Sequence, residues 1–295
     1  MKKLIFQGAG VAIVTPFTEN GINFDEFGRI IDDQIKAGTD AIVVAGTTGE
    51  AATMSDAEHK EAIKYAVEHV KKRVPVIAGT GSNDTSYAIQ LSQYAEKVGV
   101  DGLLLVTPYY NKCTQKGLVQ HFTKIADSVN VPCILYNVPS RTGVSIKLAT
   151  YVELSKHKNI VAAKEASGDL SFILRLRKAV GDELTVYSGN DDQIVPILSL
   201  GGKGVISVLS NVAPSDTHKI CQLYFDGKVK EAAAMQIDYT DLVDALFCEV
   251  NPIPVKTAMR LMGYNVGPLR LPLCDMEQGT LEQLKAAMKA HHLID

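Results

Sequence analysis

The stretch Ala41-Ile42-Val43-Val44-Ala45-Gly46 decides how the rest of the sequence is interpreted. It is apolar throughout and ends in glycine, and similar runs lie at residues 74–79 (VPVIAG) and 101–107 (DGLLLVT). Apolar runs without polar alternation are typical of parallel strands that helices cover on both faces. Five further runs complete a series that repeats about every thirty residues, and they lie at 11–17, 131–137, 160–166, 184–189 and 204–208.

The segments between these runs predict helices. Ser55 and Glu58 form a capping box before one apolar stripe, Asp84 opens the next helix, and Gly99 ends it at a left-handed position. Strands that alternate with helices predict an α/β fold, either a closed (β/α)8 barrel, the TIM-barrel fold, or an open doubly wound sheet. We favour the barrel, which usually takes about 250 residues, because the chain of 295 residues then leaves room for an extension.

The sequence changes character after residue 226, where the strand pattern stops. Helical patterns take its place, and Thr280 with Gln283 suggests a capping box at the start of the last of them. These patterns lie at 229–248, 254–262 and 280–291. We expect a catalytic barrel over residues 1–226 and a C-terminal helical domain over 227–295, packed directly on the barrel because no Ser/Gly-rich linker separates them.

The composition restricts the possible partners. The 30 basic and 33 acidic side chains leave a formal charge of −3, so nothing suggests a nucleic-acid or anionic-membrane partner. The N-terminal stretch MKKLIFQGAG has too short an apolar run for a signal sequence or a spanning helix. An odd number of cysteines without a C-x-x-C pair is typical of reduced thiols, and we expect a cytoplasmic protein.

Lys164 is the first candidate for a reactive group, because barrel enzymes place such groups at the carboxyl ends of their strands. It interrupts the apolar run 160–163, and strand alternation predicts that it shares a face with Ile160 and Ala162. Burial would disfavour the ammonium form and leave free amine to attack a carbonyl. The alternative is a lysine that turns to solvent or pairs with Glu165.

Polar residues at other strand ends are the candidate partners of this lysine. Tyr136 ends the preceding run and can relay protons, although buried tyrosines also serve as plain hydrogen-bond partners. Thr47 and Thr48 offer hydroxyls and backbone N–H groups to a carboxylate, unless they only form a turn. Arg141 offers a forked donor for a second carboxylate, and a surface arginine is the other interpretation.

Phosphate and metal chemistry find little support. Asp191 and Asp192 follow the seventh run, where barrels often bind phosphate, and two carboxylates would repel it; we interpret them as helix caps. The histidines show neither H-E-x-x-H nor facial-triad spacing, so we expect no metal site. They lie at positions 59, 69, 121, 157, 218, 291 and 292.

Four motifs in order resemble the dihydrodipicolinate synthase family: 46–50 (GTTGE), 107–111 (TPYYN), 136–143 (YNVPSRTG) and 164–166 (KEA). The resemblance implies a (β/α)8 barrel with a C-terminal helical domain. It also implies condensation of pyruvate with L-aspartate 4-semialdehyde to 4-hydroxy-tetrahydrodipicolinate, in the diaminopimelate route to lysine. Pyruvate would form a Schiff base with an enzyme lysine, and neither metal nor other cofactor would take part.

The resemblance also implies roles for residues at the motif positions. Lys164 would form the imine, and Tyr136, Thr47 and Tyr110 would form a proton relay. Tyr110 would come from a neighbouring subunit, because the family usually assembles as homotetramers built from tight dimers. We therefore expect a homo-oligomer.

Four further positions are implied to bind the substrates. Thr48 would hold the pyruvate carboxylate and Arg141 the semialdehyde carboxylate, and the backbone of Gly189 and Ile206 would line the pocket. Two other functions stay open. N-acetylneuraminate lyases and keto-sugar-acid aldolases resemble this scaffold but do not usually have the arginine, and a non-catalytic pyruvate-binding barrel would not need the lysine and both tyrosines.

One departure from the family pattern concerns feedback by lysine. Many members are inhibited by lysine at the dimer interface, where the pattern has Ser, His and Glu at positions that are Ala51, Asp56 and Tyr87 here. Loss of the glutamate removes a carboxylate suited to the amine of the effector. We therefore predict weak or absent inhibition by lysine.

Overall fold

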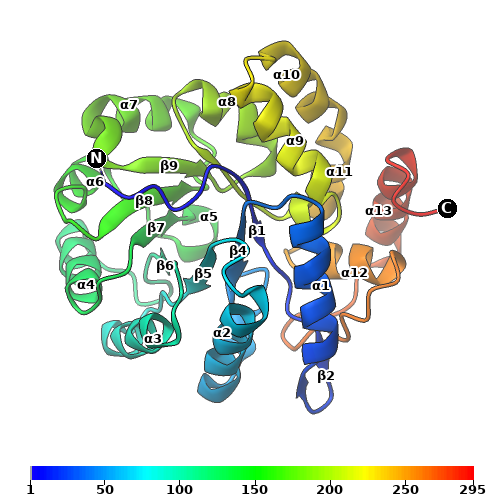
Figure 1. Ribbon diagram of the computed structural model, residues 1–295, viewed down its shortest axis with the longest axis horizontal. Helices are drawn as coiled ribbons and strands as arrows, with labels where there is room; N and C mark the ends of the chain where they lie inside the picture. Colours follow the sequence, from blue (N-terminus) through cyan, green and yellow to red (C-terminus); the bar gives the residue numbers. More distant parts are fainter. Residues whose placement is uncertain (1) are drawn as a thin grey trace.

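The computed structural model describes residues 2–295, and within them eight parallel strands close into a barrel in the order β1-β10-β9-β8-β7-β6-β5-β4 (Figure 1). Strand β1 pairs with both β10 and β4, so the barrel is confirmed and the open sheet is excluded. The strands are β1 (Gly8–Ala12), β4 (Ala41–Val44), β5 (Val76–Gly79), β6 (Gly102–Val106), β7 (Cys133–Asn137), β8 (Ile160–Glu165), β9 (Thr185–Ser188) and β10 (Gly204–Ser207).

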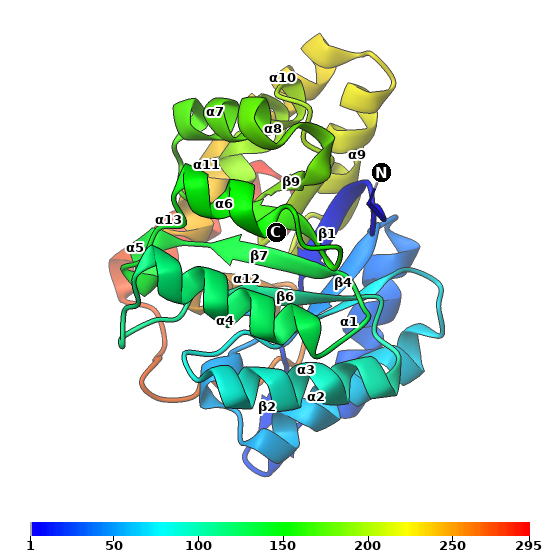
Figure 2. The ribbon, with the colours of Figure 1, turned by 90° about the vertical axis from the view of Figure 1, so that its left-hand side faces the viewer.

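Helices follow the strands and cover the outside of the barrel, as Figure 2 shows for α3 and α4 in front of β6. They are α1 (Phe24–Lys36), α2 (Asp56–Val70), α3 (Thr85–Val98), α4 (Gln115–Asp127), α5 (Pro139–Thr142), α6 (Leu148–Leu154), α7 (Leu170–Val180), α8 (Ile194–Ser199) and α9 (Pro214–Phe225). The predicted ends at Ser55, Asp84 and Gly99 are confirmed as two N-caps and a left-handed C-cap. None of the helices in residues 2–295 is both long and apolar enough to cross a bilayer.

The first strand differs from the prediction of residues 11–17. Strand β1 begins at Gly8, ends at Ala12, and is followed by a small hairpin of β2 (Phe17–Thr18) and β3 (Gly21–Ile22). Glycine is disfavoured in strands, so the apolar pattern placed the start of this strand after Gly8 and Gly10. Here it is required, because a Cβ atom on Gly8 would lie 2.1 Å from a carboxylate oxygen of Asp40.

The core has two layers, one inside the barrel and one between the strands and the helices. Ala162 lies in the inner layer with Tyr136, whereas Ile160 packs in the outer layer. The prediction that Ile160 and Ala162 share a face was therefore wrong. The register between β7 and β8 shifts by one residue at its start, and such an irregularity breaks the two-residue alternation.

The C-terminal helices gather on one side of the barrel (Figure 1). They are α10 (Val229–Asp238), α11 (Thr240–Leu246), α12 (Ile253–Leu261) and α13 (Gln278–Ala290). Leu242, Val255 and Leu284 belong to the same apolar cluster as the outer layer of the barrel, so the helices pack directly on it. The domain division at 226/227 stays a prediction.

The capping box predicted at the start of the last helix was wrong. Helix α13 begins one turn earlier, with Glu277 at its N-cap and no side-chain capping bond. Thr280 lies inside the first turn, where its hydroxyl donates to the carboxylate of Glu249. The Thr280 hydroxyl, which the local pattern assigned to a helix cap, therefore bonds to a residue distant in sequence.

Candidate active site

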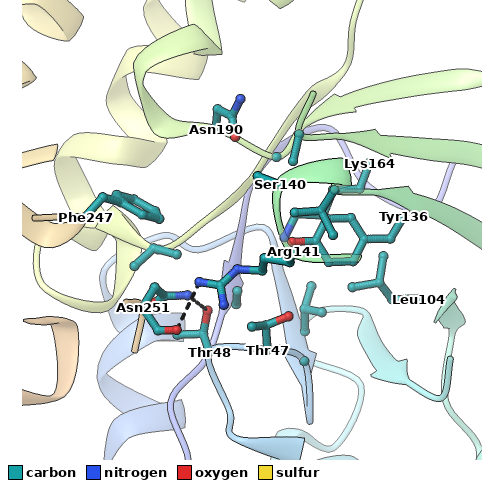
Figure 3. A pocket seen from close by; sticks show the side chains of 17 residues that line it. Thr47, Thr48, Leu104, Tyr136, Ser140, Arg141, Lys164, Asn190, Phe247 and Asn251 are labelled. Carbon is teal, nitrogen blue, oxygen red and sulfur yellow. Dashed lines mark hydrogen bonds between the residues drawn. The ribbon is translucent and has the colours of Figure 1, made fainter. Parts of the chain in front are cut away.

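A pocket of about 200 Å³ opens at the carboxyl ends of the barrel strands. Six of the eight predicted site residues line it, namely Thr47, Thr48, Tyr136, Arg141, Lys164 and Gly189. Figure 3 shows Arg141, Asn251 and Thr48 together at one end, and Lys164 with Tyr136 at the other. Strands that are far apart in sequence therefore bring the predicted groups together, as a closed barrel requires.

Lys164 occupies the inner end of the pocket. It lies on β8 directly opposite Tyr136 on β7, and its Nζ atom is 4.3 Å from the centre of the Tyr136 ring. Only 5% of the residue is exposed, so the prediction of a buried lysine is confirmed and a solvent-facing one is excluded. Its amine lines the cavity, where a carbonyl compound has access to it.

Glu165 does not pair with the lysine, although it is the next residue. Its buried carboxylate accepts hydrogen bonds from Tyr151, from Asn137 Nδ2 at 3.0 Å and from Ser167 Oγ at 2.8 Å. Burial is the main cause that raises the pKa of this carboxyl. Asn137 also accepts from the backbone N–H of Ile146 at 3.0 Å, so the network joins the ends of β7 and β8 to the loop that follows β7. It fixes the strand ends that carry Tyr136 and Lys164.

The other end of the pocket is held by Asn251, a residue that the sequence did not identify as functional. Its side-chain Nδ2 donates to Thr48 Oγ1 at 3.1 Å, and its backbone oxygen accepts from Arg141 Nη2 at 3.1 Å (Figure 3). Within residues 2–295, Asn251 Oδ1 is buried without a hydrogen-bond partner and lines the site. Its position in an NPIP turn next to a helix was the only local signal.

Arg141 is exposed to solvent and also lines the pocket. It lies in α5, which Pro139 opens and Gly143 ends with a left-handed φ of 66°. The side chain folds over the pocket and keeps its remaining N–H groups for another acceptor. A guanidinium in this place suits a carboxylate that enters the pocket.

Two predicted residues do not line the pocket. Tyr110 follows β6, has a positive φ of 67° and is 93% exposed, so within this chain it lies away from Lys164. Ile206 is fully buried in the inner layer of the barrel, and Val208, two residues further on, takes the place in the lining. Gly189 does line the pocket, and a Cβ atom there would lie 2.7 Å from the Cβ atom of Ala166.

The prediction that Asp191 and Asp192 cap the helix that follows them was wrong, because neither η3 (Asp191–Gln193) nor α8 has a side-chain capping bond. Asp191 instead caps a different segment. Its carboxylate accepts the backbone N–H groups of Val208 and Leu209, both at 2.9 Å, at the start of the short helix η4 (Leu209–Asn211). Burial raises the pKa of this carboxyl. The bonds tie the loop after β9 to the loop after β10.

The arrangement suits imine chemistry. A buried amine that faces a cavity can attack a carbonyl, and a phenol beside it can move protons. The hydroxyl and guanidinium groups at the other end can hold carboxylates. In the part of the chain that the structure describes, no cluster of three or more His, Cys, Asp or Glu could hold a metal ion.

Comparisons with known proteins agree with this chemistry. A sequence model of the dihydrodipicolinate synthetase family matches residues 5–291. The chain belongs to this family. It is 56% identical to 4-hydroxy-tetrahydrodipicolinate synthase 1 of Clostridium acetobutylicum over 290 residues, which cover 98% of this chain and 99% of the relative. It is 57% identical to the synthase of Clostridium tetani, with the same shares of the two chains covered.

The family's solved structures share the fold. One of them is a chloride-inhibited dihydrodipicolinate synthase from Acinetobacter baumannii in complex with pyruvate. It superposes with a TM-score of 0.95 at 42% identity, and the match covers 98% of this chain and 99% of the other. The predicted family and fold are therefore confirmed.

Proposed function

We propose that this chain is a 4-hydroxy-tetrahydrodipicolinate synthase, which condenses pyruvate with L-aspartate 4-semialdehyde. The observation that carries the proposal is the buried amine of Lys164, which faces a cavity beside Tyr136. Thr48 and Arg141 lie at the other end of that cavity, where carboxylates of two short keto or aldehyde acids would be held. The relatives of the same name support the choice of substrates.

The first half of the reaction builds an imine. The neutral amine of Lys164 attacks C2 of pyruvate, and loss of water from the carbinolamine gives a protonated imine. Thr48 holds the pyruvate carboxylate through its hydroxyl and backbone. The protonated imine withdraws electrons, so the methyl group loses a proton and an enamine forms.

The second half forms the carbon–carbon bond and releases the lysine. The enamine carbon attacks the aldehyde of the semialdehyde, whose oxygen takes up a proton, while Arg141 holds its carboxylate. The amine of the substrate then attacks the imine carbon and displaces Lys164, which closes the ring. No step needs a metal, flavin or nicotinamide.

Protons pass through Tyr136, Thr47 and a Tyr110 from a neighbouring copy of the chain. Tyr110 supports this arrangement because it is 93% exposed, in a strained left-handed conformation, next to the half-exposed Tyr109. A large aromatic side chain in such a place gains from a partner surface. We therefore propose a homo-oligomer, expected as a tetramer of tight dimers, in which assembly completes the site.

Reduction with borohydride in the presence of pyruvate tests the proposal. The reductant converts the imine into a stable secondary amine, so Lys164 should gain the mass of the reduced pyruvate adduct, and peptide mapping locates it. A sample without pyruvate is the control. Label at another lysine, or none, contradicts the mechanism, and a rate comparison with N-acetylneuraminate tests the choice of substrate.

Regulation by lysine is proposed to be weak or absent. Asp56, at the position where inhibited members have histidine, is paired with Lys60 Nζ at 2.8 Å. Tyr87 takes the place of the glutamate, and its pKa is raised to about 12, chiefly by burial. Tyr87 has no carboxylate, and its phenol stays uncharged at neutral pH, so it gives the amine of lysine no negative partner. Initial rates with added L-lysine check this, and inhibition at sub-millimolar concentrations contradicts it.

A further inference from the structure

The loop at residues 46–50, which carries Thr47 and Thr48, ends in an unusual residue. Glu50 has a left-handed backbone with φ of 56° and ψ of 34°, which costs a non-glycine residue about 1 kcal/mol or more. Its side chain is completely buried. Other contacts must therefore hold Glu50 in place.

Those contacts come from the C-terminal helical region, 206 residues further along the chain. Lys256 Nζ, on α12, lies 2.7 Å from Glu50 Oε1, and both side chains have an exposed fraction of 0%. Lys256 also donates to the backbone oxygen of Pro268 at 2.9 Å. The second oxygen of Glu50 accepts the backbone N–H of Arg270 at 3.1 Å. The carboxylate is thus bound on both sides by one region.

A second contact joins the same two regions. Asn251, which lies just before α12, donates to Thr48 within the loop at 3.1 Å (Figure 3). The loop is therefore attached to the C-terminal region at both Thr48 and Glu50. Phe17, on β2, packs against the same region. The centre of its ring lies 4.8 Å from Lys256 Nζ and 3.8 Å from the Arg270 guanidinium.

Stability alone does not explain a fully buried ion pair. Removing two charges from water costs about as much as their attraction returns, so an apolar pair of the same volume often stabilises a fold as well. A buried pair does fix geometry, because each charge is strongly disfavoured in any arrangement that separates them. The position of this pair, at the end of a substrate-binding loop, shows which geometry it fixes.

We propose that Glu50 and Lys256 are positioning residues for the pyruvate-binding loop: the pair clamps residues 46–50 to the C-terminal helices so that Thr47 and Thr48 face the substrate. This inference rests on the proposed function. It assigns a role in catalysis to α12, which makes no contact with the reacting atoms. The clamp acts on pyruvate through the loop, whereas Arg141 is attached to the backbone of Asn251 and keeps its place.

The test compares Lys256→Met with the wild type by steady-state rates in both substrates. Lys256→Met leaves the Glu50 carboxylate buried without its cation, so the loop should shift. The KM for pyruvate should rise about tenfold or more, which corresponds to about 1.4 kcal/mol, while the KM for the semialdehyde changes less than about threefold. A purely structural role would lower the amount of active enzyme, and hence kcat, and leave both KM values unchanged.

Two further variants complete the design. Glu50→Gln has the same shape and gives a folded sample for the same measurement if Lys256→Met does not fold. The double variant Glu50→Gln/Lys256→Met removes both charges and should have a lower pyruvate KM than Lys256→Met. Lys285→Met is the matched control, because its pair with Glu282 has a similar N–O distance of 2.9 Å but its side chains are 33% and 57% exposed, and it should leave both KM values unchanged.

The outcomes separate this inference from the function on which it rests. If wild-type protein gives no borohydride-trapped pyruvate on Lys164, the proposed function is wrong. If the wild type is trapped but folded Lys256→Met or Glu50→Gln keeps a pyruvate KM within about threefold, the clamp is wrong. A parallel rise of both KM values also overturns it, because the effect is then not confined to the pyruvate loop.

Discussion

Residues 2–295 contain two buried lysines that differ in almost everything except burial. Lys164 is 5% exposed, and its amine faces a cavity and the ring of Tyr136. Lys256 is completely buried, and its amine is held by the carboxylate of Glu50 and the backbone oxygen of Pro268. Burial lowers the pKa of Lys256, and the carboxylate of Glu50 opposes this effect.

The difference shows that burial does not by itself make a lysine reactive. Two fixed acceptors, the Glu50 carboxylate and the Pro268 backbone oxygen, hold the Lys256 amine away from the pocket, so its role is structural. Lys164 lies at a strand end in the barrel mouth, has room around it, and has a phenol for its protons. Among residues 2–295, no carboxylate lies within ion-pair distance of its amine.

The largest expected effect tests the chemical difference between the two lysines. Lys164→Met should lower kcat by about ten-thousandfold or more, because no other amine is placed to form the imine. Lys256→Met should still be labelled on Lys164 at saturating pyruvate. Initial rates and borohydride trapping measure the two variants side by side. Substantial turnover by Lys164→Met would mean that another group carries the reaction.

The second prediction concerns the free energy of unfolding. Here Lys256→Met should have the larger effect, and Lys164→Met the smaller one. Lys256→Met should lower the free energy of unfolding by about 3–5 kcal/mol, because it leaves a buried carboxylate without its partner. Lys164→Met removes a buried amine that has no carboxylate partner, and it should be neutral or stabilising. Urea unfolding of both variants provides the measurement. Equal losses in the two variants would remove the structural distinction between the two lysines.

The sequence predicted one of these lysines and not the other, for a physical reason. Lys164 interrupts an apolar run at a strand end, and that local contrast is visible in the sequence. Lys256 lies in an unremarkable helix, and its partner Glu50 lies 206 residues away. Nothing local distinguishes a lysine with a distant buried partner from one on a helix surface.

The same limit explains the other misses. Patterns of apolar runs predicted the barrel, because they report which segments are covered on both faces. They missed the start of β1, where Gly8 is needed for close contact with Asp40, and the shift at Ile160. Asn251 was missed as an individual residue, because its importance comes only from what it touches, Thr48 and Arg141.

A third prediction tests whether the reactivity of Lys164 depends on the hydroxyl of Tyr110. Tyr110→Phe should lower kcat about a hundredfold, because it removes a proton-transfer hydroxyl from the relay. The imine should still form and be trapped, since the amine of Lys164 is untouched. Sedimentation of the variant shows whether the oligomer persists. A rate within about threefold of the wild type, with assembly unchanged, would remove Tyr110 from the relay.

The smallest expected effect concerns the partly exposed ion pair of Arg270 and Glu58, which lies beside the buried pair of Lys256 and Glu50. Arg270 packs on the same Phe17 ring as Lys256, but it bonds to Glu58 with both side chains 23% exposed. The hydrogen bond from Arg270 is the main cause that lowers the pKa of Glu58 from 4.5 to about 2. A depressed carboxyl pKa stabilises the folded state above the unfolded pKa, and this contribution is lost as the pH falls through the folded one.

We therefore expect Glu58→Gln to lower the free energy of unfolding by about 1–2 kcal/mol at neutral pH, a value reduced by solvent screening. The difference from the wild type should shrink below about pH 4.5 and approach zero only below about pH 2, where Glu58 is protonated in both states. Urea unfolding at a series of pH values measures it, with Glu282→Gln as the exposed control. A difference that does not depend on pH would mean that Glu58 acts through packing rather than charge. The water-exposed pair would then resemble the buried one, whose contribution lies in geometry.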